Sequence, residues 1–258
     1  MLKDARRLTD KNGRPRLGKE MLKKLRADVK WVCQKAKSKG YLSHAIWEGL
    51  DRPAALKPTA PKLTFTIPKF AECWGVLEER DRLAFELVTF VGLRESDVFG
   101  LKCGDVIAGG LSICRSFYRG SINPPKNEVS FREVGAPREI VERLREYIVG
   151  LSANGPDDWL FPSTKITTPE WPYNAINNRI RPRLTTVGRG GLTFAILRRI
   201  FSSANKKEGT DLELMAHQQG HHLSEYVQPD RAQLAEETEK LYAKFKANRV
   251  KGRNDGMR

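Results

Sequence analysis

Long apolar runs and secretion signals are missing from this sequence. No stretch of its 258 residues comes near the roughly 20 consecutive apolar residues that a membrane-spanning helix requires. The N-terminus also lacks the successive basic, apolar and small-residue regions of a signal peptide. These absences argue against a membrane protein and against a secreted one. We expect a globular protein in the cytoplasm, with no membrane partner.

Cysteine and histidine are scarce as well. The chain has 4 of each, with no C-x-x-C motif and no histidine at zinc spacing from a cysteine. We therefore predict no metal site, and we expect reduced, structural thiols at Cys33, Cys73, Cys103 and Cys114. The sequence also contains no internal repeat.

Positive charge, by contrast, is abundant and unevenly distributed. The formal net charge is +15, and residues 1–57 hold 16 Lys or Arg against 6 Asp or Glu, a net +10. A surplus of this size favours a polyanionic partner, through counterion release and long-range steering. We interpret residues 1–57 as a module that faces nucleic acid, although basic surfaces also suit acidic proteins and membrane surfaces.

A proline-rich stretch separates two regions of helical periodicity. Apolar residues three and four apart predict a helix at residues 19–39, which Gly40 ends. We assign residues 1–57 to a basic helical segment, 58–62 to a linker, 63–248 to a larger domain and 249–258 to a disordered basic tail. One helix cannot form an independent core, so we expect that a fuller N-terminal domain precedes it in the parent protein.

The larger domain is predicted to be mainly helical with one small sheet. Its helices are expected at residues 68–79, 82–91, 137–148, 173–184, 197–204, 212–220 and 230–248, and its strands at residues 111–114 and 129–134. The predicted fold class is therefore mainly α with a small antiparallel β-sheet (α+β).

Two short stretches place arginines where packing can hold them. The first reads GLRESD at residues 92–97, where Ser96 or Asp97 stands in position to cap a helix. The second reads LRRIFSSA from Leu197, with Arg198 beside an apolar helix face. Gly220-His221 and Tyr226 follow it. Arginine, histidine and tyrosine together suit the attack of a phenol on a phosphodiester.

These stretches resemble the motifs of the tyrosine recombinases, the phage integrase family. GLRESD, followed by L-x-x-x-D-V at residues 101–106, resembles the first arginine box, and LRRIFSSA resembles the second. Gly220-His221 matches the family's Gly-His pair, and Lys126 stands where the family has its hairpin lysine. WLFPS from Trp159 is a further marker. The basic N-terminal segment is similar to the last helices of the core-binding domain, so the resemblance covers nearly the whole chain.

The resemblance implies a site-specific DNA recombinase or integrase with a catalytic-domain fold of this family. Such an enzyme cuts and rejoins double-stranded DNA through a 3′-phosphotyrosyl intermediate, without metal or nucleotide cofactor. It acts as a homotetramer on two DNA sites, and accessory DNA-bending proteins are compatible with it. Carried over by motif, the catalytic residues are Arg94, Lys126, Arg198, His221 and Tyr226. We add five residues as DNA contacts: Lys23, Lys24, Arg26, Lys30 and Arg199.

Each residue type suits the role that the resemblance gives it. A phenol has a pKa near 10 and needs a positive pocket before it attacks. Arg94 and Arg198 would supply that pocket, and a fixed donor to developing charge is typically worth about 10²–10³ in rate. Lys126 would protonate the leaving 5′-oxygen, and His221 would hydrogen-bond the phosphate. Asp97 would order the pocket beneath the arginines.

The sequence departs from the family pattern at two places. Ala195 stands where the family usually has a histidine, and Tyr226 follows His221 by five positions instead of nine. Using His217 as the histidine restores a spacing of nine but loses the preceding glycine. These departures leave open a catalytically inactive DNA-binding protein of the same fold, acting as a regulator of recombination or transcription. The other tyrosines of this domain are expected to pack: Tyr118, Tyr147, Tyr173 and Tyr242.

Overall fold

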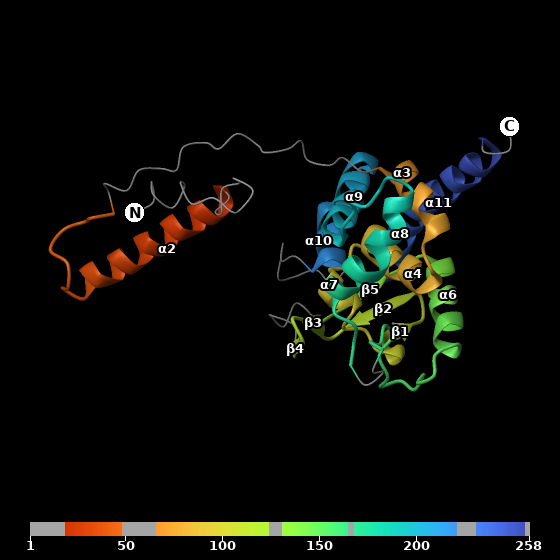
Figure 1. Ribbon diagram of the computed structural model, residues 1–258, viewed down its shortest axis with the longest axis horizontal. Helices are drawn as coiled ribbons and strands as arrows, with labels where there is room; N and C mark the ends of the chain where they lie inside the picture. Colours follow the sequence, from red (N-terminus) through yellow and green to blue (C-terminus); the bar gives the residue numbers. More distant parts are fainter. Residues whose placement is uncertain (1–18, 48–65, 124–130, 165–167, 221–230, 256–258) are drawn as a thin grey trace. The chain divides into compact units, whose positions relative to one another are not determined.

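A computed structural model of the chain describes residues 19–47, 66–123, 131–164, 168–220 and 231–255 (Figure 1). The chain divides into two compact units, residues 1–62 and 63–258, which are described separately. All four cysteines are free thiols. Within the described ranges, no helix combines the length and the apolar character that crossing a membrane requires.

The described part of the N-terminal unit is dominated by α2 (Lys19–Ser38), which confirms the helix predicted there. The Gly40 N–H donates to the Lys37 carbonyl and the Tyr41 N–H to the Ala36 carbonyl, a Schellman ending that needs the positive φ of Gly40, 78°. The predicted apolar stripe is not buried along its whole length, since Val32 is 57% exposed. The basic side chains of this helix from Lys23 onward are exposed or half-buried.

The larger unit is built around α4 (Glu79–Phe90), which is buried from Leu83 to Phe90. Helices α6 (Arg138–Val149) and α9 (Phe194–Glu208) pack against it, and α11 (Arg231–Asp255) packs on α3 (Ile67–Cys73). The other described helical elements are η1 (Trp74–Val76), α5 (Glu95–Val98), η2 (Cys103–Asp105), α7 (Pro172–Asn174), the π-helical η4 (Ala175–Ile180), α8 (Arg181–Thr186) and α10 (Leu212–Gln219).

A small antiparallel sheet lies within this helical unit (Figure 1). Its strands run in the order β1 (Val106–Ile107), β2 (Gly110–Ile113) and β5 (Arg132–Gly135), so the two predicted strands do pair. The register places Ile113 opposite Arg132. A separate hairpin, β3 (Ser116–Tyr118) with β4 (Ser121–Asn123), was not predicted, because three-residue strands carry too little alternation to read. The fold class, mainly α with a small antiparallel sheet, is confirmed.

Two predicted helix boundaries are clearly wrong. The helix predicted at residues 68–79 is instead broken, with α3 ending at Cys73 and α4 beginning at Glu79. The tail predicted to be disordered from residue 249 is helical to Asp255, as part of α11. Tertiary contacts anchor this helix: the Tyr242 hydroxyl donates to Glu139 at 3.0 Å, and the Arg249 guanidinium lies 5.2 Å from the ring centre of Trp74.

Candidate functional site

Arg94 and Arg198 converge on the end of one helix. Arg94 is the N-cap residue of α5, directly after the turn that Gly92 makes with a φ of 79°, and Arg198 lies on α9. Arg94 donates to the carbonyl oxygen of Gly220 at 3.2 Å, and Arg198 donates to that of Gln219 at 2.6 Å. The carbonyls at a helix C-terminus carry partial negative charge, which favours cations. The last turn of α10 therefore brings both arginine boxes together.

A third arginine, Arg132 of β5, joins them and was missed by the sequence analysis. Its guanidinium donates to Asp97 Oδ2 at 3.0 Å and to the Gln218 carbonyl at 3.4 Å, and its side chain is 2% exposed. One signal could have found it. Arg132 shares the inward side of its strand with buried Val134, while Glu133 between them is exposed. An arginine at an inward position is rarely there without a partner.

Asp97 is the buried carboxylate beneath this arginine cluster, which we define as Arg94, Arg132 and Arg198. Its Oδ2 lies 3.0 Å from Arg132 and 4.0 Å from Arg94. The predicted capping role is wrong: the N-cap of α5 is Arg94, and no side chain caps that helix. Two of the three guanidinium groups thus lie within 4.0 Å of this buried carboxylate. Three positive charges against this one negative charge leave a surplus suited to an anion.

The pKa values of the buried arginines also favour the binding of an anion. Burial, followed by the neighbouring charge of Arg94, lowers the pKa of Arg198 to about 10. Burial also lowers the pKa of Arg132, against the opposing effect of Asp97. A lowered pKa means that the charged guanidinium is less stable in this environment than in water. An anion at the cluster would relieve that cost, and a phosphate can accept paired hydrogen bonds from arginine.

Gly220 lies very close to two arginines of the cluster. Its φ is 65°, and a Cβ at this position would lie 2.8 Å from the Arg132 guanidinium and 2.9 Å from that of Arg94. A side chain would therefore strain the backbone and displace two arginines together. This geometry gives a physical reason for the glycine of the Gly-His pair.

We expect Gly220→Ala to reduce the free energy of unfolding and DNA cleavage by more than backbone strain alone would. The left-handed conformation costs an alanine roughly 1–3 kcal/mol in unfolding free energy, measurable by denaturant titration. Gly209→Ala is a matched control, because Gly209 ends α9 with a φ of 75° and has no atom within 4 Å of its would-be Cβ. An equal loss of stability in both variants, with DNA cleavage retained by both, would contradict the role assigned to Gly220.

The remaining predicted site residues are not brought into the cluster by the described structure. Lys126, His221 and Tyr226 lie outside the described residues. Arg199 is exposed, and its Nε donates to the Ala195 carbonyl of the same helix. The predicted DNA contacts Lys23, Lys24, Arg26 and Lys30 are all on α2, in the other unit.

The alternative histidine, His217, has a partner of its own. Its Nε2 donates to the Glu133 carbonyl on β5 at 3.0 Å, and burial lowers its pKa. This hydrogen bond links α10 to the sheet. It also engages one of the two ring nitrogens of His217 with a backbone carbonyl. Among the described residues, no group of three or more His, Cys, Asp or Glu side chains could hold a metal ion.

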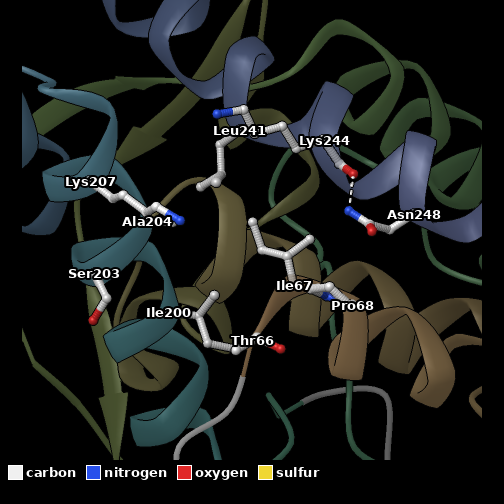
Figure 2. Close-up of a pocket in the computed structure, with 10 residues that line it drawn as sticks. All are labelled: Thr66, Ile67, Pro68, Ile200, Ser203, Ala204, Lys207, Leu241, Lys244 and Asn248. Atoms are coloured by element: carbon white, nitrogen blue, oxygen red, sulfur yellow. Dashed lines mark hydrogen bonds between the residues drawn. The ribbon is translucent and has the colours of Figure 1, made fainter.

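A cavity of about 360 Å³ lies between α3, α9 and α11 (Figure 2). Ile67, Ile200 and Leu241 line it with apolar groups, while Lys207 and Lys244 add positive charge. Residues two apart on a helix point about 200° apart, so Ile200 faces away from Arg198. None of the described site residues lines this cavity, and it is separate from the arginine cluster.

Comparisons with known proteins relate this arrangement to one family. The model described as the phage integrase family matches residues 66–232. The Tn1549 transposon integrase (residues 82–397), solved with a circular intermediate DNA, is similar with a TM-score of 0.68 and 14% identity, over 88% of this chain and 80% of that one. The integrase of mycobacterium phage Brujita is similar with a TM-score of 0.54 and 15% identity, over 88% and 73%.

A further similar structure is a lambda integrase tetramer bound to a Holliday junction, with a TM-score of 0.54 and 18% identity, over 81% of this chain and 61% of that one. At such identities the likeness concerns the fold. A search of curated proteins finds no match.

Proposed function

Because this chain belongs to the phage integrase family, we propose that it is a site-specific recombinase that cuts and rejoins double-stranded DNA through a phosphotyrosyl intermediate. One observation carries the proposal: Arg94 and Arg198, from the two arginine boxes, meet with Arg132 at the end of α10. Such a cluster suits a phosphodiester, whose non-bridging oxygens gain negative charge during displacement.

Arginine geometry suits this task. A guanidinium has five N–H donors in a rigid plane, so it can hold a helix-end carbonyl and a phosphate oxygen at once. The partner carbonyls of Gln219 and Gly220 fix the orientation of Arg198 and Arg94 before DNA arrives. Donors that are already oriented need little reorganisation when charge develops on the phosphate.

The proposed reaction requires no nucleotide cofactor. The Tyr226 hydroxyl gives up its proton to a water molecule and attacks the phosphorus, and the bond to the 5′-oxygen breaks. Lys126 protonates that leaving oxygen, and His221 hydrogen-bonds a non-bridging oxygen. The phosphotyrosine preserves the energy of the broken bond, so a 5′-hydroxyl of another strand can attack it and release the tyrosine.

The proposed active assembly is a homotetramer on two DNA sites, with accessory DNA-bending proteins as compatible partners. In support, one similar structure is a lambda integrase tetramer on a Holliday junction. The apolar residues of α11, namely Leu234, Leu241 and Phe245, are buried within this chain. Docking of that helix on a neighbour would therefore require its release from both α3 and β5.

Covalent capture on a nicked duplex tests the proposal. Duplexes that the full chain binds are first selected from a random library, and the strand is then nicked beside each candidate cleavage position. A nick lets the small fragment leave and traps the phosphotyrosine as a band on a denaturing gel. We expect a protease-sensitive adduct. Specific binding with no adduct at any position would instead favour the DNA-binding regulator.

We expect the basic face of α2 to contribute much of the salt dependence of DNA binding. Lys23, Lys24 and Lys30 are exposed there, and each neutralised phosphate contributes about −0.9 to the slope of log K against log salt concentration. Replacing all three with glutamine should flatten the slope by about 0.9 for each phosphate that a lysine no longer neutralises. Lys240→Gln is the control, because Lys240 pairs with Glu236 and Glu237. A slope that does not change in the triple variant would show that α2 does not touch DNA.

A further inference from the structure

A second cavity, of about 480 Å³, is lined in part by chain neighbours of two cluster arginines. Glu95 and Ala195 line it, and these residues are the direct neighbour of Arg94 and the residue one helical turn before Arg198. Its other walls come from the β3–β4 turn and from the segment that begins at Trp171. The cavity falls within the roughly 300–1,000 Å³ typical of sites for small molecules and nucleobases.

Aromatic side chains gather at this cavity without being buried in it. Tyr118 is 55% exposed, Trp171 37% and Tyr173 62%, and the rings of Trp171 and Tyr173 lie 5.2 Å apart. Tyr118 and Tyr173 were expected to pack in the interior, and the structure corrects that expectation. An exposed aromatic group beside a charged site is typical of a surface that binds a partner.

Charged and hydrogen-bonding groups also line the cavity. The Arg119 guanidinium lies 5.3 Å from the ring centre of Tyr118, and Arg181 donates to the side-chain oxygen of Asn177. Aromatic rings and arginines in one lining match the chemistry of a nucleobase attached to a phosphate chain. Bases stack on aromatic rings in a largely sequence-tolerant way, while arginine contacts the backbone.

Ala195 is the smallest side chain in the lining of this cavity. It is exposed in the first turn of α9 and contributes only a methyl group to the lining. A histidine at that position, the residue type the family usually has there, would extend from the same turn beside Arg198. The small side chain thus leaves room next to the proposed phosphate position.

We propose that this cavity receives an unpaired base of the nucleotide next to the scissile phosphate, stacked against Trp171 and Tyr173. The inference rests on the proposed function, because it places the scissile phosphate at the arginine cluster. Extruding a base costs stacking and pairing energy, and that cost is least where the base is already mismatched. The cavity therefore makes cleavage sites with weak or missing pairing at one position the preferred substrates.

A mismatch scan across the cleavage position tests the inference. Duplexes carry one mismatch at each position in turn, and affinity for the full chain is measured at constant salt. We expect one mismatch, next to the scissile phosphate, to raise affinity by about 5- to 150-fold, the range that aromatic stacking of one base supports. Tyr173→Ala should remove most of this gain and leave affinity for the fully paired duplex unchanged. Tyr173 is more than half exposed, so this variant is expected to fold.

Leu212→Ala, at an apolar residue of α10 that is 61% exposed and lies outside the cavity, is the control and should retain the gain. Equal affinity for paired and mismatched duplexes, or equal losses on both in Tyr173→Ala, would overturn the inference. The covalent adduct on nicked DNA is scored in the same samples. An adduct without a mismatch effect leaves the recombinase proposal standing, whereas the absence of any adduct counts against that proposal.

Discussion

Tyr226→Phe is expected to abolish the covalent adduct while preserving folding and DNA binding. The change removes only the hydroxyl that would attack the phosphorus. Tyr226 follows Gly220 by six positions, and an extended chain covers about 3.3–3.6 Å per residue, so its Cα can lie at most about 22 Å from that of Gly220. The measurement is the yield of adduct on a nicked duplex, with binding followed in parallel.

Other tyrosines provide the controls for this result. Tyr41→Phe changes a residue that is 79% exposed in the other unit, and it should leave the adduct yield unchanged. Tyr242 is an unsuitable nucleophile, because burial and then Glu86 raise the pKa of its hydroxyl. An adduct that persists in Tyr226→Phe would therefore direct attention to exposed Tyr118 and Tyr173.

Mixing variants separates two ways of delivering the tyrosine. Tyr226→Phe retains the arginine cluster, and Arg198→Lys retains the tyrosine. If each protomer supplies its own tyrosine, a mixture of the two gives no more adduct than Arg198→Lys gives alone. If a neighbouring protomer supplies it, the mixture regains adduct. The short spacing between His221 and Tyr226 makes this distinction worth measuring.

Arg94→Lys and Arg198→Lys are each expected to slow cleavage by about 10²–10³, with DNA affinity nearly intact. A lysine ammonium cannot reproduce the planar fork that reaches a helix-end carbonyl and a phosphate together. Overall affinity depends on many phosphates, so one altered contact changes it little. The measurement is the rate of adduct formation at saturating protein.

Arg199→Lys is the matched control for these substitutions. Arg199 neighbours Arg198 on α9, but its Nε donates to the Ala195 carbonyl of the same helix instead of the α10 end. Keeping its positive charge should leave the cleavage rate close to that of the unchanged protein. Normal cleavage by Arg94→Lys or Arg198→Lys would remove that arginine from the proposed phosphate site.

Local patterns in the sequence were enough to find much of this molecule. Helices such as α2, α6 and α10 follow from apolar spacing and from their end signals, which act within a few residues. The two arginine boxes were also visible as short motifs, and the structure brings Arg94 and Arg198 together. Lys126, His221 and Tyr226 remain predictions from the resemblance.

Tertiary packing determined the features that local sequence patterns could not predict. Arg132 enters the cluster because β5 pairs with β2 and because Asp97, far away in sequence, is buried beside it. The helix continues to Asp255 because α11 packs on α3 and stacks on Trp74. Whether a tyrosine is buried depends on which elements cover it, and nothing within a few residues of Tyr173 encodes that. Periodicity determines which face of an element is apolar, whereas the neighbours that cover the face are set by contacts distant in the chain.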